Sequence, residues 1–150
     1  MKKLFLLCMV AIAASFVSCA EKEEGEITID NAKLIGRWEI YKTVNIDYDY
    51  RDEITEWGES YGIREIWEFL ADGTGAIIQM DIDDQGQWWT DRDPFTYSLT
   101  DGTICIHWDN DYNDDYLYYE TIEKLTSNEL VLVEDWGDNY INYFYFKRVI

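Results

Sequence analysis

The sequence predicts an all-β fold, an antiparallel up-and-down barrel of eight to nine strands formed by residues 34–150. Three observations predict it. Short segments in which apolar and polar residues alternate follow one another along the chain, as half-buried strands do. Tight turn pairs, Asp72-Gly73 and Asp101-Gly102, separate several of these segments. Hydrophobic residues make up 47% and aromatic residues 17% of the 150 residues, which excludes a disordered chain despite a net charge of -19. A two-sheet sandwich is the alternative.

The N-terminal part, residues 1–18, has the features of a secretion signal. Lys2 and Lys3 precede an apolar run over residues 4–17, which is shorter than the roughly 20 residues of a membrane span. The run ends in Ser18-Cys19, which resembles the bacterial lipoprotein signal. This resemblance implies that Cys19 is lipid-modified and anchors the protein to a membrane; an ordinary cleaved signal is the alternative. Residues 19–33 are charged and are expected to form a flexible tether.

The stretch from residue 34 to residue 40 is expected to open the barrel. Gly36 permits a tight bend where no side chain fits. Trp38, near the start of a strand over residues 37–44, is expected to fill the closed end of the interior. The longest gap follows, at residues 47–62. Its aromatic spacing would allow a short helix, and a lid over an open barrel mouth would lie there.

Two hairpins can be registered from their turns. A two-residue turn at Asp72-Gly73 places one mostly apolar set on a single face. This set is Trp67, Phe69, Ala76, Ile78 and Met80. The turn at Asp101-Gly102 predicts three apolar pairs on one face and a polar opposite face that carries Cys105 and His107. These pairs are Leu99 with Ile104, Tyr97 with Ile106 and Phe95 with Trp108.

The remaining strands are expected at residues 116–125, 129–135 and 140–148, with a weaker segment at residues 88–90. Ser127-Asn128 and Gly137-Asp138 supply turns between them. The single proline, Pro94, precedes the strand that begins at Phe95, where proline is tolerated.

Three motifs resemble the lipocalin-like lipoproteins of Bacteroidetes. They are Gly36-Arg37-Trp38 (a Gly-x-Trp motif), the hairpin sequence FLADGTG at residues 69–75 and the closing FYFKR at residues 144–148. The resemblance covers residues 34–150 and implies a lipocalin-like barrel. It also implies that Arg148 on the last strand packs over Trp38, so that Gly36, Trp38 and Arg148 close the barrel. The location implied is the cell envelope, with a lipid anchor in the outer membrane and display on either its periplasmic or its outer face.

The function expected from this fold is binding of a small, mostly apolar ligand, without catalysis. An eight-stranded barrel can be filled by side chains or can hold one small ligand, and both remain open here. The residues expected to face a cavity are Trp38, Ile40, Trp67, Phe69, Ile78, Met80, Tyr97, Ile106, Trp108 and Phe144. The alternative function is a cell-surface module that binds glycan or protein through exposed aromatic residues. The candidates for that surface include Tyr116, Tyr118, Tyr119 and Trp136.

Several other chemistries are disfavoured. The serines stand outside any Gly-x-Ser-x-Gly motif, and His107, the only imidazole, is expected on the outer face, so a nucleophilic triad is nearly excluded. One histidine and Cys105 cannot form a standard zinc site. An enzyme that uses its acidic residues is the least favoured reading. The strongly acidic surface repels phosphate backbones, which argues against nucleic acid.

One acidic segment resembles a calcium-binding loop. Asp109, Asp111, Asn113 and Glu120 occupy the first, third, fifth and twelfth places of the D-x-[DN]-x-[DN]-G-x5-E pattern. Asp114 stands where the pattern has glycine. Calcium is therefore the one candidate cofactor, and a solvated loop between strands is the favoured alternative.

Overall fold

The computed structural model describes residues 30–47, 52–108, 117–137 and 140–150. Over these ranges the chain forms nine strands, one short helix and one 3-10 turn. In chain order these elements are α1 (Asn31–Leu34), β1 (Gly36–Asp47), β2 (Glu53–Glu56), η1 (Glu59–Tyr61), β3 (Ile63–Phe69), β4 (Thr74–Ile82), β5 (Trp88–Thr100), β6 (Thr103–Trp108), β7 (Leu117–Leu125), β8 (Glu129–Asp135) and β9 (Tyr140–Val149). Cys19 and the expected signal at residues 1–18 lie outside the described residues. None of the helical segments described here is long and apolar enough to cross a bilayer.

Eight of these strands close into an antiparallel barrel. The predicted fold class is therefore confirmed, and the alternative of a two-sheet sandwich is wrong. Strands β3 to β9 pair in sequence order, and β1 pairs with both β3 and β9. One edge of β1 is bonded to β9 over residues 37–47. The other edge is bonded first to β3, at residues 36–39, and then to β2, at residues 42–45. Strand β2 is therefore an extra strand. It pairs with the second half of β1, beyond the residues that pair with β3.

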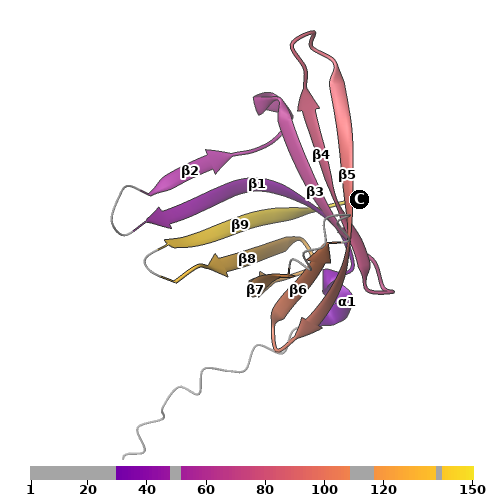
Figure 1. The fold of residues 1–150 in the computed structure, drawn as a ribbon, viewed down its shortest axis with the longest axis vertical. Coiled ribbons are helices and arrows are strands. Elements are labelled where there is room, and N and C mark those ends of the chain that lie inside the picture. The colour runs from indigo at the N-terminus through magenta and orange to yellow at the C-terminus, as the bar shows by residue number, and fades with distance from the viewer. Residues whose placement is uncertain (1–29, 48–51, 109–116, 138–139) are drawn as a thin grey trace, which may run out of the picture.

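The strands meet near α1 and the C-terminus and diverge from there (Figure 1). Strands β3, β4 and the first part of β5 form one arm, and β1, β9 and β8 form the other. Strand β5 is long enough to serve two partners, since it pairs with β4 over residues 88–96 and with β6 over residues 95–100. Pro94 lies where the pairing with β6 ends, so its missing N–H leaves that ladder intact. The weak segment at residues 88–90 and the Phe95 strand are thus one strand.

The gap at residues 47–62 contains a strand and a 3-10 turn rather than the short helix that its aromatic spacing allowed. Glycines at both ends of η1 have positive φ, 134° at Gly58 and 75° at Gly62, which stops helical propagation. Trp57 packs against the core, and its indole N–H donates to the Thr43 hydroxyl at 3.3 Å. The segment therefore contributes to the barrel wall.

The β5–β6 hairpin has the predicted register, with Leu99 opposite Ile104 and Tyr97 opposite Ile106. Asp101 and Gly102, with φ of 47° and 80°, make the two-residue turn that this register requires. Trp108 lies opposite Phe95.

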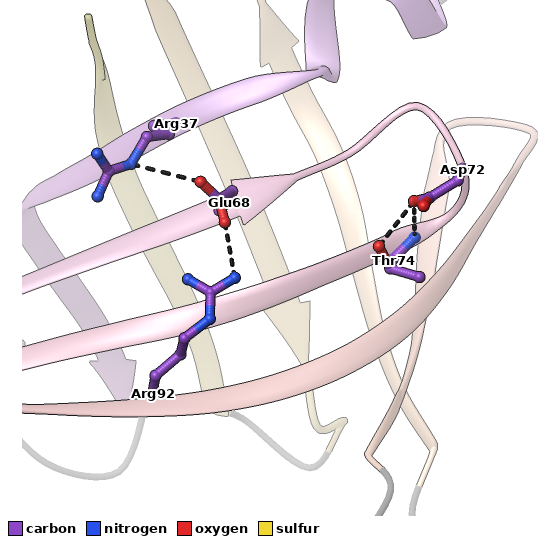
Figure 2. A network of polar contacts seen from close by, with 5 residues as sticks. All are labelled: Arg37, Glu68, Asp72, Thr74 and Arg92. Carbon is purple, nitrogen blue, oxygen red and sulfur yellow. Dashed lines mark hydrogen bonds and ion pairs between the residues drawn. The ribbon is translucent and has the colours of Figure 1, made fainter.

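The β3–β4 register differs from the prediction by one residue. The backbone N–H of Leu70 donates to the Thr74 carbonyl at 2.8 Å, so the loop holds three residues and not two. The Asp72 carboxylate accepts from the backbone N–H of Thr74 at 3.0 Å and from its hydroxyl at 2.7 Å, which holds this longer loop (Figure 2). Trp67 consequently lies opposite Ile77, and Phe69 lies opposite Gly75.

This shift corrects two predicted cavity residues. Ile78 and Met80 belong to the face of β4 opposite to Gly75 and Ile77, and therefore point away from the interior. Gly75 fits its interior position because an added Cβ would overlap the Phe95 ring and the Glu68 carbonyl.

The narrow end of the barrel is closed by Trp38 and Arg148, as the resemblance implied. The guanidinium carbon of Arg148 lies 4.3 Å from the centroid of the Trp38 ring, and the Trp38 side chain is fully buried. Arg148 also donates to the Ile35 carbonyl at 2.9 Å, to the Ser127 carbonyl at 2.7 Å and to the Lys33 carbonyl. An added Cβ on Gly36 would overlap the Arg148 guanidinium. One side chain thus joins the chain before β1, the β7–β8 turn and β9.

Residues 31–33, the last residues of the expected tether, form the helix α1 together with Leu34. Asp30 caps α1 by accepting from the backbone N–H of Ala32 at 3.2 Å. Leu34, at the end of α1, is 1% exposed, and its carbonyl accepts from the Trp38 indole at 2.8 Å. The burial of Leu34 thus connects α1 to the core.

The outer face of β1, β3, β4 and β5 carries ion pairs over buried apolar residues. Glu68 lies between two arginines, 2.8 Å from Arg92 and 3.7 Å from Arg37 (Figure 2). A second set joins Glu39 to Arg64 at 2.7 Å and to Lys147 at 3.6 Å. Burial raises the pKa of Glu39, but the Arg64 hydrogen bond and charge, with Lys147, outweigh it and hold that pKa below its ordinary value. The apolar residues beneath these pairs are Ile66, Ala76 and Ile78.

Candidate ligand-binding site

The barrel interior is filled at the narrow end. Trp38, Ile40 and Phe69 are each no more than 1% exposed and pack with Phe146 and Leu132 in one continuous core. Three of the ten predicted cavity residues therefore fill the barrel rather than line a space. These close-packed side chains form the floor of the remaining interior space.

Above this floor the interior holds a cavity of about 230 Å³. The cavity is partly open to solvent, and its volume is below the roughly 300–1,000 Å³ of sites for drug-sized ligands, so it suits a small molecule. Six strands contribute side chains that point inward. The lining residues are Trp67, Ile77, Ile106, Trp108, Tyr118, Glu120, Glu134 and Phe144.

Four of the eight lining residues are aromatic, and neighbouring rings pack against them. Trp108 and Tyr118, on neighbouring strands, are nearly perpendicular, with ring centroids 6.4 Å apart and an interplanar angle of 89°. Phe95 packs edge-on behind Trp108 at 5.4 Å. The Trp67 indole N–H donates to Glu65 at 2.7 Å, and its ring packs on Phe146 at 5.4 Å. The walls are therefore held in position without a ligand.

Two carboxylates interrupt this apolar lining. Glu120 on β7 is only 4% exposed, and its Oε2 has no hydrogen-bond partner among the described residues. Burial, and then the nearby charge of Glu134 on β8, raises the pKa of Glu120 to about 8. Glu134 accepts from the Asn142 side-chain amide at 3.1 Å. The amide oxygen of Asn142 is itself buried and has no partner in the described part of the chain. The polar atoms around the cavity are therefore mostly acceptors.

A further acid lies on the interior face of β3. Burial raises the pKa of Glu65, its hydrogen bond from Trp67 lowers it, and the charge of Asp81 raises it, for a net increase. A group that enters the cavity would thus meet a low-dielectric, negatively biased environment.

Four of the predicted cavity residues line the cavity: Trp67, Ile106, Trp108 and Phe144. Tyr97 packs against the filled core instead, and its hydroxyl donates to the Leu70 carbonyl at 2.8 Å. Ile78 and Met80 lie on the outer face, so six of the ten predicted residues fill the core or point outward and four line the cavity.

The prediction missed the acidic side of the cavity. Tyr118 was expected on the surface but lines the cavity, and Glu134 was not singled out. The sequence held a signal for this side. Tyr118, Glu120 and Ile122 are spaced two residues apart and so share one face of their strand, and Glu134 shares a face with Leu132 in the same way. Two of the surface candidates, Tyr119 and Trp136, are exposed, at 59% and 58%. Tyr116 lies outside the described residues.

The calcium prediction falls mostly on residues that the structure does not describe. Asp109, Asp111 and Asn113 lie in the segment 109–116, and Glu120 faces the cavity. Elsewhere in the described ranges, no three His, Cys, Asp or Glu side chains come together as metal ligands. Cys105 is a free, half-buried thiol, and His107 pairs with Thr96 on the outward face of β6.

Comparisons with known proteins agree with the fold. No family model matches the chain, and no curated protein matches it in sequence. Among solved structures, a lipocalin-like protein from Bacteroides uniformis is 18% identical with a TM-score of 0.51, over 78% of this chain and 99% of its own. A protein from Bacteroides eggerthii is 14% identical with a TM-score of 0.49, over 77% and 98%. Lobster apocrustacyanin A1 is 15% identical with a TM-score of 0.45, over 80% and 63%.

At this level of identity, the similarity to the Bacteroides uniformis protein concerns the fold alone. The chain is an all-β, eight-stranded closed barrel with one extra strand and a lipocalin-like architecture.

Proposed function

We propose that this chain is a non-catalytic binding protein that holds one small molecule in the cavity above the Trp38 core. The observation that carries the proposal is the partly open cavity of about 230 Å³ with prearranged aromatic walls. Rigid aromatic surfaces give a ligand large contact area at low entropic cost. Lipocalin-like neighbours in structure support the same kind of function, because barrels of this size commonly hold one small ligand.

The test is a pair of substitutions on the same strand. Ile77→Phe would place a ring into the cavity, whereas Ile82→Phe changes an exposed residue of β4. Small aromatic probes should bind the unchanged protein and the Ile82→Phe variant and should not bind Ile77→Phe, measured by titration calorimetry. Equal binding by both variants would place the ligand outside this cavity.

We propose further that the protein is held at the bacterial envelope by a lipid on Cys19, on the outer membrane. Support comes from the apolar segment that ends in Ser18-Cys19. Cells fed an alkyne fatty acid should label the full-length protein, and Cys19→Ser should abolish the label and release the protein from membranes. Cys8→Ser, inside the expected leader, is the matched control. An unlabelled protein would indicate an ordinary cleaved signal.

The alternative, a surface module for glycan or protein, has its support in the exposure of Tyr119 and Trp136. It predicts that an oligosaccharide or protein ligand loses affinity with Trp136→Ala and is unaffected by Ile77→Phe. The cavity proposal predicts the reverse.

A further inference from the structure

We propose that the ligand of this cavity is a small organic cation, an amine or ammonium on a compact apolar body, with Glu120 and Glu134 as its charge partners. This inference rests on the proposed function and adds the chemical class of the ligand. It also changes the expectation of a mostly apolar ligand, because the cavity has two carboxyl groups on one side.

The first argument is the balance of donors and acceptors. Glu120 Oε2 and the Asn142 amide oxygen are buried and have no partner among the described residues. The hydrogen bond from Asn142 to Glu134 uses the amide nitrogen, so the free atom of that side chain is the acceptor. Leaving a buried acceptor unpaired costs free energy, and an ammonium group in the cavity would donate to Glu120 Oε2, whose side chain lines it.

The second argument is the nature of the walls. Trp108 and Tyr118 stand nearly perpendicular to each other beside Glu120, and Trp67 and Phe144 complete the lining. Faces of aromatic rings attract cations within about 6 Å of their centroids, and the attraction is larger when the cation is desolvated. The same rings would repel an anion and would pack against an apolar body.

The third argument is the placement of positive side chains. No lysine or arginine is among the residues that line the cavity in the described structure. Arg37, Arg64, Arg92 and Lys147 are instead engaged with Glu39 and Glu68 on the outer face. The carboxylates in the cavity thus lack a protein counter-ion there, and the net charge of -19 would draw cations toward the barrel.

Cation binding should be linked to a proton. Since burial and Glu134 raise the pKa of Glu120 to about 8, Glu120 carries a proton at neutral pH when the cavity is empty. The titratable groups that face Glu120 are Glu134 on β8 and Tyr118 on its own strand, and Glu65 lies on β3 with its pKa raised by burial. A bound cation favours the ionised form, so its binding should release a proton.

The experiment compares three probes of similar shape by calorimetry on the protein made from the full-length sequence. They are phenethylamine (a cation), 2-phenylethanol (neutral) and phenylacetate (an anion), with hexylamine and 1-hexanol as an aliphatic pair. The proposal expects each amine to bind at least tenfold more tightly than its neutral partner, and phenylacetate not to bind. Phenethylamine affinity should rise roughly tenfold between pH 7 and pH 8.5, because the ionised fraction of Glu120 rises by about that factor.

The variants are Glu120→Gln and Glu134→Gln, with Glu123→Gln, an exposed residue of β7, as the matched control. Each cavity variant should weaken amine binding about tenfold or more, and Glu120→Gln should remove the pH dependence, while Glu123→Gln behaves as the unchanged protein. If the alcohols bind as tightly as the amines, the inference of a cationic ligand is wrong and the proposed binding function remains. If no probe binds, both proposals fail. Amine binding that ignores Glu120→Gln and Glu134→Gln would place the cation elsewhere and overturn the inference.

Discussion

Replacing Glu120 with glutamine should make the protein more stable at high pH. The pKa of Glu120 is about 8 in the folded protein, against an ordinary value of 4.5, because the carboxyl is buried beside Glu134. Between these values the folded state holds a proton that the unfolded state has lost, so the free energy of unfolding falls as pH rises through this window. The full shift corresponds to an upper limit of roughly 5 kcal/mol. Glutamine keeps the shape without the charge and removes this loss.

The assay is urea unfolding at pH 5 and pH 9 of the unchanged protein, Glu120→Gln and Glu123→Gln. At pH 5 the three proteins should differ little. At pH 9 the free energy of unfolding of Glu120→Gln should exceed that of the other two proteins by a few kcal/mol. Glu123 is exposed, so replacing it does not remove a buried charge. Parallel pH dependence in Glu120→Gln and the unchanged protein would refute the idea that this carboxyl is buried and uncompensated.

Three further predictions concern the fold. Arg148→Met should cost about 2–4 kcal/mol in urea unfolding, because it removes three carbonyl hydrogen bonds and the contact with the Trp38 ring; a cost below about 0.5 kcal/mol would contradict its closing role. Gly75→Ala should lower the free energy of unfolding by roughly 1–3 kcal/mol, because the added methyl group would overlap the Phe95 ring. A two-residue turn would place Gly75 on the outer face, and an unchanged free energy of unfolding would therefore contradict the three-residue loop. Glu39→Gln should cost about 1–2 kcal/mol at pH 7. Since the pKa of Glu39 is lowered, that cost should fade as pH drops below the ordinary value toward the lowered one, and a constant cost would argue against the Arg64 pair.

Local signals were enough for much of the barrel. The β5–β6 register follows from Asp101-Gly102, where both residues take positive φ, and from an apolar face that a one-residue slip would expose. The same kind of signal failed at Asp72-Gly73, because the Asp72 side chain stabilises a three-residue loop that this dipeptide also permits. That one residue moved Ile78 and Met80 to the outer face.

The sequence by itself determined the all-β class and most of the strands, since these depend on alternation and turn chemistry. The Trp38–Arg148 contact that closes the narrow end was implied by the resemblance of its motifs to a known family. Only the tertiary structure decided which part of the interior is filled and which is open. The cavity is built from side chains of six strands, and its acidic side from Glu120 and Glu134, whose burial depends on neighbours distant in the chain. The energy of a buried carboxyl arises from the dielectric and the charges around it, and these exist only once the barrel has closed.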